Sequence, residues 1–142
     1  MERDAKVQIT VQVSLNLSVD KVWTIWTTPS HIIHWNFASD DWHSPFAEND
    51  LQVGGKFNYR MESKDGKIGF DFDGVYTAIK HNELITYKLA DGRLINIEFI
   101  SKNSTTQIIE TFEAESENSV DLQRNGWQAI LDNFKGYAQI CK

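Results

Sequence analysis

A chain of 142 residues is long enough to bury a core without disulfides or metals, and we expect a single domain over residues 1–142. Acidic residues outnumber basic ones by 20 to 14, so the net charge is −6, and without a basic cluster a nucleic acid is a disfavoured partner. No stretch approaches the ~20 apolar residues of a membrane span, the charged start lacks the apolar core of a signal sequence, and Cys141 is the only cysteine. We therefore expect a cytoplasmic protein in a reducing compartment.

The first part of the chain is predicted to form one strand and two helices. Apolar residues occupy every second position over residues 7–17, which is typical of a half-buried strand. Ser18 is placed to cap a helix whose apolar face consists of Val19, Val22, Trp23 and Trp26. Thr28 and Pro29 mark the start of a second, short helix, which we expect to end near Trp35.

The middle of the chain is predicted to be rich in antiparallel strands. Residues 36–53 show no periodic pattern and are predicted to be irregular. Beyond them, the Asp-Gly pairs at residues 65–66 and 91–92 are strong hairpin signals, and a further turn is expected at Asn103. The predicted strands are 56–63, 67–80, 83–89, 93–101 and 105–116.

The C-terminal segment has the period of a helix. Apolar side chains recur at i, i+3, i+4, i+7 and i+11, and they are Trp127, Ile130, Leu131, Phe134 and Ala138. This pattern predicts one amphipathic helix of about five turns.

This order of elements resembles the helix-grip fold of the START-like (SRPBCC) superfamily. Several motifs narrow the resemblance to one family, which is named for the C-terminal domain of the activator of the Hsp90 ATPase (activator of Hsp90 ATPase homologue 1-like). The stretches of this sequence that resemble the family are DDW, ENDLQVGGKFNYRM, FDGVYTAI, TFEAE and NGWQAILDNFKGYAQ. The resemblance extends over residues 7–138. It implies an α+β fold in which a curved antiparallel sheet of six to seven strands wraps around the long C-terminal helix. Two short helices would follow the first strand, and a cavity would lie between sheet and helix.

The resemblance does not define one function, because one fold can carry many different sites. The superfamily includes lipid and hormone binders, polyketide cyclases, hydrolases and a co-chaperone. We expect first that the cavity binds a small apolar or aromatic ligand, without a cofactor. Two alternatives stay open: an enzyme of the cyclase or hydrolase kind, and a module that interacts with Hsp90. The eukaryotic co-chaperone binds Hsp90 through a separate N-terminal domain, and the resemblance of this sequence does not extend to that domain.

Residues 31–43 hold three of the four histidines, two of the five tryptophans and two adjacent aspartates. A zinc site there would use His31 and His34, with a third ligand from Asp40, Asp41 or His43. The segment has no HExxH pattern and no cysteine partner, so we expect no metal site. It is better interpreted as a wall of the cavity, with Trp35 and Trp42 covering apolar surface.

Strand alternation predicts which side chains line the cavity. On the strands, the inward phase holds Phe57, Tyr59, Met61, Phe70, Phe72, Ile85, Tyr87, Ile95, Ile97, Phe99, Ile108 and Phe112. The C-terminal helix would face them with Trp127, Ile130 and Phe134. Apolar residues of the opposite phase, such as Ile100 and Ile109, leave a homodimer open.

Glu110 falls in the same inward phase as its apolar neighbours. A carboxyl group in an apolar cavity would have a raised pKa and could act in acid–base chemistry, with His34 and Tyr59 as the other candidate catalytic residues. Two alternatives stay open: a bulge that turns Glu110 to solvent, and an ion pair with Arg60 or Arg93.

Overall fold

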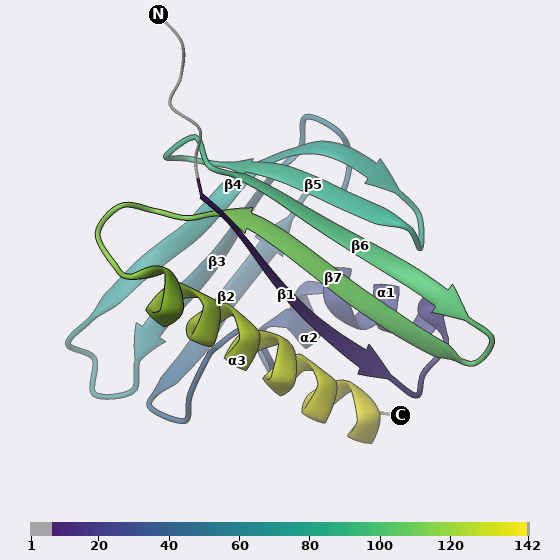
Figure 1. The fold of residues 1–142 in the computed structure, drawn as a ribbon. Helices are drawn as coiled ribbons and strands as arrows, with labels where there is room; N and C mark the ends of the chain where they lie inside the picture. Colours follow the sequence, from purple (N-terminus) through teal and green to yellow (C-terminus); the bar gives the residue numbers. More distant parts are fainter. Residues whose placement is uncertain (1–6, 142) are drawn as a thin grey trace, which may run out of the picture.

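The computed structural model describes residues 7–141, which form one antiparallel sheet and three helices (Figure 1). In chain order the elements are β1 (Gln8–Leu15), α1 (Val19–Thr27), α2 (Pro29–Ile32), β2 (Trp42–Asn49), β3 (Lys56–Ser63), β4 (Gly69–Lys80), β5 (Leu84–Leu89), β6 (Leu94–Lys102), β7 (Thr105–Glu113) and α3 (Val120–Ile140). Most of the charged start, for which we expect no signal sequence, lies outside the described residues.

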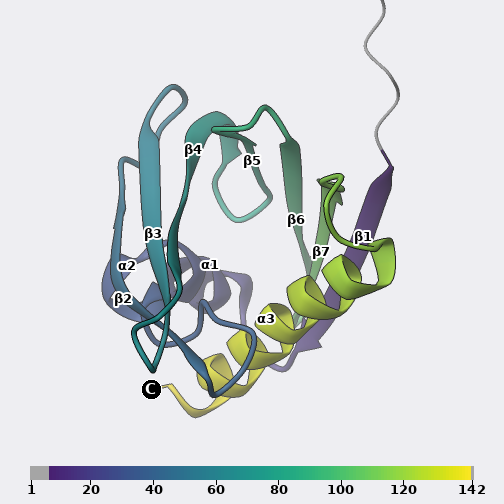
Figure 2. The same cartoon turned by 90° about the vertical axis from the view of Figure 1, so that its left-hand side faces the viewer.

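The seven strands form one sheet in the order β1-β7-β6-β5-β4-β3-β2, and each strand is antiparallel to its neighbours. Strands β2 to β7 follow one another along the chain, while β1 pairs with β7 at the far edge. Figure 2 shows that the sheet is strongly curled and that α3 crosses its open side. The predicted helix-grip architecture is therefore confirmed.

Three tight turns of the sheet lie at the predicted positions. Gly66 and Gly92 have φ angles of +76° and +95°, and Asn103 has a φ of +57°. These left-handed conformations reverse the chain within a few residues, and glycine adopts them without steric cost. These turns join β3 to β4, β5 to β6 and β6 to β7, and so set the register of each of these pairs.

One strand differs from the prediction. Residues 36–53, predicted to be irregular, contain β2, which pairs with β3 at the edge of the sheet. The register shifts between His43 and Phe46, and Pro45 lies at this irregularity. A bulge and a proline both interrupt the alternation of inward and outward side chains, so the strand carries no clear period in the sequence.

The two N-terminal helices begin where predicted, but their caps and one end differ. Ser18 and Thr28 precede α1 and α2 in extended conformations, yet neither side chain makes a capping hydrogen bond. Helix α2 ends at Ile32 rather than near Trp35. After it the chain tightens into a three-residue turn, in which the Trp35 amide donates to the Ile32 carbonyl at 3.2 Å.

Helix α3 is amphipathic, as predicted, and lies along β1. On its inner face Leu131, Phe134 and Ala138 are fully buried. Beside that face, the Gln128 amide binds the free edge of β1: its Nε2 donates to the Gln12 carbonyl at 3.0 Å, and its Oε1 accepts from the Gln12 amide at 3.3 Å. The side chain thus satisfies backbone groups that no neighbouring strand reaches.

We expect Ser119→Ala to lower the free energy of unfolding by about 1 kcal/mol, because the Ser119 hydroxyl accepts a hydrogen bond from the Leu122 amide at the start of α3. Ser18→Ala is the matched control, since Ser18 has the same place before α1 without a side-chain bond. Urea unfolding should show a loss for Ser119→Ala and little change for Ser18→Ala. Equal losses in the two variants would contradict the assignment.

Candidate ligand-binding site

A cavity of about 510 Å³ lies between the sheet and α3. Its wall combines α1, the segment after α2, strands β3, β4, β5 and β7, the β7–α3 loop and α3. Helix α3 packs along β1, on one side of the concave face, so the inner faces of β3, β4 and β5 are left free to line a space (Figure 2). The volume lies within the roughly 300–1,000 Å³ of small-molecule sites.

Many of the side chains expected in the cavity wall lie there. They are Trp35, Tyr59, Met61, Phe70, Phe72, Ile85, Tyr87, Trp127 and Ile130. Phe70 is 47% exposed, so it lies where the cavity meets solvent. Trp127 of α3 stacks flat on Phe112 of β7, with ring centroids 3.8 Å apart and 10° between the planes.

Another part of the expected wall belongs to the core instead. These side chains have the expected inward phase, but helices or neighbouring rings cover them: Phe57, Ile95, Ile97, Phe99, Ile108, Phe112 and Phe134. Phe134 packs edge-on against Trp26 and Trp35, at centroid distances of 5.0 and 4.9 Å. Trp42 is also outside the wall, half-buried with its ring 5.9 Å from that of Phe70. Alternation identifies the face of a strand but not which part of that face a helix occupies.

The prediction also missed part of the wall. The additional lining residues are Trp26, Thr27, Asn36, Tyr76, Arg93, Glu115, Glu117, Asn118 and Gln123. Tyr76 shares the parity of Phe70 and Phe72 on β4, so the same alternation could have identified it. The residues of the β7–α3 loop carry no such signal, because their place depends on how α3 docks against β1.

Glu110 lies on β7, and its side chain faces the cavity with only 5% of its surface exposed. Burial raises the pKa of this carboxyl group from 4.5 to about 8, because surroundings of low dielectric constant disfavour its charged form. Among residues 7–141, no side-chain hydrogen bond or ion pair engages it. At neutral pH Glu110 is therefore mostly a protonated acid with free hydrogen-bonding capacity.

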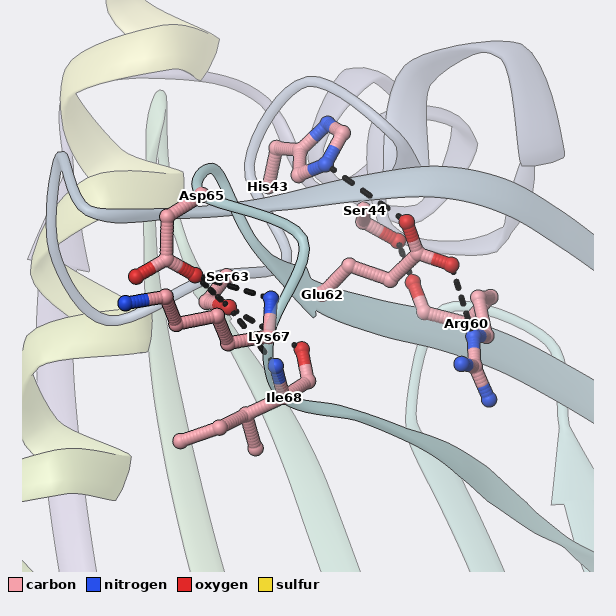
Figure 3. Close-up of polar contacts among 8 residues, drawn as sticks. All are labelled: His43, Ser44, Arg60, Glu62, Ser63, Asp65, Lys67 and Ile68. Atoms are coloured by element: carbon pink, nitrogen blue, oxygen red, sulfur yellow. Dashed lines mark hydrogen bonds and ion pairs between the residues drawn. The ribbon is translucent and has the colours of Figure 1, made fainter.

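Neither of the arginines considered as partners pairs with Glu110. Arg60 Nε donates to Glu62 at 2.9 Å (Figure 3). Arg93 Nε donates to Asp91 at 2.8 Å. The bulge considered for β7 is absent as well, since this strand keeps a continuous register with both β1 and β6.

Tyrosine hydroxyl groups accompany Glu110 in the cavity wall. The hydroxyl oxygens of Tyr59 and Tyr76 lie 3.4 Å apart. Burial raises the pKa of Tyr59 and of Tyr87 well above the usual value, and the negative charge of an ionised Glu110 raises that of Tyr87 further. These phenols stay neutral, so each can donate or accept a hydrogen bond.

His34 is not brought together with Glu110 and Tyr59. It is exposed, and its ring stacks on Tyr137 of α3 with centroids 5.6 Å apart and 17° between the planes. Helix α2 ends at Ile32, so His34 does not share a helical face with His31. The three candidate catalytic side chains therefore do not converge on one point.

The other histidines of residues 31–43 contact neighbours outside that segment. His31 Nδ1 lies 2.7 Å from the hydroxyl oxygen of Tyr137. His43 Nε2 lies 3.8 Å from a carboxylate oxygen of Glu62 (Figure 3). Nowhere in residues 7–141 do three His, Cys, Asp or Glu side chains gather in a group that could hold a metal ion.

A curled sheet, a helix across its open side and a cavity between them define a START-like protein of the helix-grip class. Residues 16–139 match the family described as Activator of Hsp90 ATPase homolog 1-like protein, and the chain belongs to this family. Within the described part of the chain, no helix is both long and apolar enough to cross a membrane.

Solved structures share the fold over nearly the whole chain. The AHSA1-like protein from Aeromonas hydrophila is 38% identical, with a TM-score of 0.88 over 94% of this chain and 92% of that chain. A protein from Cytophaga hutchinsonii is 47% identical, with a TM-score of 0.82 over 93% of this chain and 92% of that chain. A protein from Nitrosomonas europaea, 17% identical, shares the fold with a TM-score of 0.79 over 95% of this chain and 96% of that chain. Among curated proteins, no sequence matches.

Proposed function

We propose that the protein binds a small apolar or aromatic molecule in the cavity between the sheet and α3, as a single domain acting in the cytoplasm. The observation that carries the proposal is the cavity of about 510 Å³ whose wall consists largely of aromatic side chains. Such rings offer large contact area, and the few polar groups among them can orient a ligand. Membership of a family with a helix-grip fold supports the same function.

A neutral fluorescent probe, N-phenyl-1-naphthylamine, tests this proposal. We expect the probe to brighten on binding the wild-type protein and to bind about tenfold more weakly or not at all to Ile130→Trp, because a larger ring on α3 would fill the cavity. Asn125→Trp is the matched control, since Asn125 is exposed on the same helix. A probe that binds all three proteins equally would place the apolar site elsewhere.

The natural ligand can be sought by native mass spectrometry of untagged protein purified from its own cells. A reproducible organic adduct that is lost in Ile130→Trp and kept in Asn125→Trp would identify the occupant of the cavity. An adduct that persists in both variants would be bound outside it.

An enzyme of the cyclase or hydrolase kind is the second candidate. The observation that favours it is Glu110, a buried acid whose pKa of about 8 suits proton transfer near neutral pH, with the Tyr59 hydroxyl in the same wall. An enzyme should convert the recovered ligand, and Glu110→Gln should stop the conversion while the naphthylamine probe still binds. Recovery of unchanged ligand after incubation with the wild-type protein argues for binding alone.

The family relationship also makes Hsp90 a candidate partner. A change in the ATPase rate of Hsp90 on addition of this protein would support that role. An unchanged rate, together with no complex in size-exclusion chromatography, would remove it.

A further inference from the structure

The cavity wall has an unusual combination of side chains: many aromatic faces and an excess of carboxyl groups. Rings from α1, from β3 to β5 and from α3 surround the space, among them Trp26, Tyr59, Phe72 and Trp127. The face of an aromatic ring carries partial negative charge and attracts cations. A positively charged ligand would therefore be attracted by the rings as well as by the acids.

The charged side chains of the wall also favour a positively charged ligand. Glu110, Glu115 and Glu117 line the cavity, and Arg93 is the only lining lysine or arginine among the described residues. The guanidinium group of Arg93 is already paired with Asp91 at 2.8 Å. The whole chain, with these residues included, has a net charge of −6. An anionic ligand would thus meet the negative charges of Glu115 and Glu117.

Glu110 is the most deeply buried of these acids. Only 5% of its surface is exposed, and no described side chain binds its carboxyl group. Because the carboxyl group faces the cavity, a ligand there can supply the hydrogen-bond partner that the described side chains do not provide. A protonated amine supplies both a donor and an opposite charge, which makes a charge-assisted hydrogen bond.

We infer that the cavity selects an aromatic or apolar amine, with its ammonium group paired to the carboxylate of Glu110 and its apolar body among the aromatic rings. This inference rests on the proposed function, because it names the class of ligand that the same cavity binds. Tyr59 and Tyr87 add hydroxyl groups that can accept from the ammonium group.

Proton exchange on binding gives a signature of this pairing. Glu110 is mostly protonated at pH 7, so pairing with an ammonium group must release its proton to the buffer. The other titratable groups of the wall are Tyr59, Tyr76, Tyr87, Arg93, Glu115 and Glu117. Burial raises the pKa of the three tyrosines, which keep their protons at this pH. If the proton release disappears in Glu110→Gln, the released proton comes from Glu110.

Three probes with the same naphthalene ring test whether the cavity prefers a positive, a neutral or a negative ligand. They are 2-naphthylmethylamine, 2-naphthylmethanol and 2-naphthoate. Their binding to the full chain would be measured by isothermal titration calorimetry at pH 7, in two buffers of different ionisation enthalpy. We expect the amine to bind the wild-type protein about tenfold or more tightly than the alcohol, with a buffer-dependent heat that reports proton release. Glu110→Gln should lower the affinity for the amine to near that for the alcohol and abolish the proton release. Glu98→Gln, an exposed glutamate on β6, is the control and should behave as wild type.

The remaining outcomes separate this inference from the function on which it rests. Equal binding of amine and alcohol, or an amine preference that survives in Glu110→Gln, would overturn the inference and leave ligand binding in the cavity standing. Preference for the naphthoate would overturn it too and would point to Arg93. If no probe binds the wild-type protein, both the inference and the proposed function fail.

Discussion

We expect Glu110→Gln to make the protein more stable, by an amount that grows as the pH rises from 5 to 9. The reason is that the folded state holds Glu110 as a neutral acid with a pKa of about 8, whereas the carboxyl group ionises near 4.5 when the chain is unfolded. Between these values the unfolded state has lost a proton that the folded state keeps. Stability of the wild-type protein therefore falls as the pH rises through this window.

The size of the effect follows from the two pKa values. Below about pH 4.5 the group is neutral in both states, and it contributes no pH dependence. Above about pH 8 it is ionised in both states, and the full destabilisation is present. Each pKa unit corresponds to about 1.4 kcal/mol, so the gain in Glu110→Gln should reach about 3–5 kcal/mol at pH 9 and be small at pH 5.

Urea unfolding at pH 5, 7 and 9 measures this difference. Glu98→Gln is the matched control, because the same change on the exposed side of β6 should leave the wild-type pH dependence intact. If the wild-type protein and Glu110→Gln show parallel pH curves, Glu110 titrates as a solvated carboxylate and its assignment to the cavity wall is wrong.

Trp127→Ala should lower the free energy of unfolding by about 3 kcal/mol, near the lower end of the range for removal of a buried aromatic side chain. The ring stacks on Phe112 of β7 and lies edge-on to Phe72 of β4, at centroid distances of 3.8 and 6.0 Å. It is only partly buried because one side forms cavity wall, which places the expected loss below that of a fully enclosed tryptophan.

Two further variants distinguish stacking from a general effect on α3. Trp127→Phe keeps an aromatic ring on Phe112 and should cost about 1 kcal/mol. Leu122→Ala removes a side chain that is 59% exposed on the same helix and should change stability by less than about 0.5 kcal/mol. A loss below about 1 kcal/mol for Trp127→Ala would mean that the contact between α3 and β7 is not formed as described.

The fold could be predicted where the sequence is strictly periodic. The alternation over residues 7–17 gave β1, and the helical spacing from Trp127 to Ala138 gave α3 with its buried face. Strand β2 was missed because its bulge and Pro45 interrupt the period. A local pattern reveals an element only while the backbone keeps one regular conformation.

The site was less predictable than the fold, for a different physical reason. The period of two assigns Phe57, Tyr59 and Phe112 to one face of the sheet, and all three do point inward. Only Tyr59 lines the cavity, since Phe112 lies beneath Trp127 and Phe57 is enclosed by other rings. Whether an inward side chain becomes wall or core depends on how the helices and the neighbouring rings pack on the sheet, which no short stretch of sequence encodes.

The sheet is open, and its two outer strands have different protection against pairing with other chains. At the β1 edge the Gln128 amide occupies backbone groups of Gln12 that could otherwise bind an incoming strand. At the β2 edge Pro45 offers no N–H, and the register shift there distorts the ladder. Each edge is thus a poor template for intermolecular strand addition, which lowers the risk of aggregation. We therefore expect any homodimer of this protein to form through side chains rather than through a continuous intermolecular sheet.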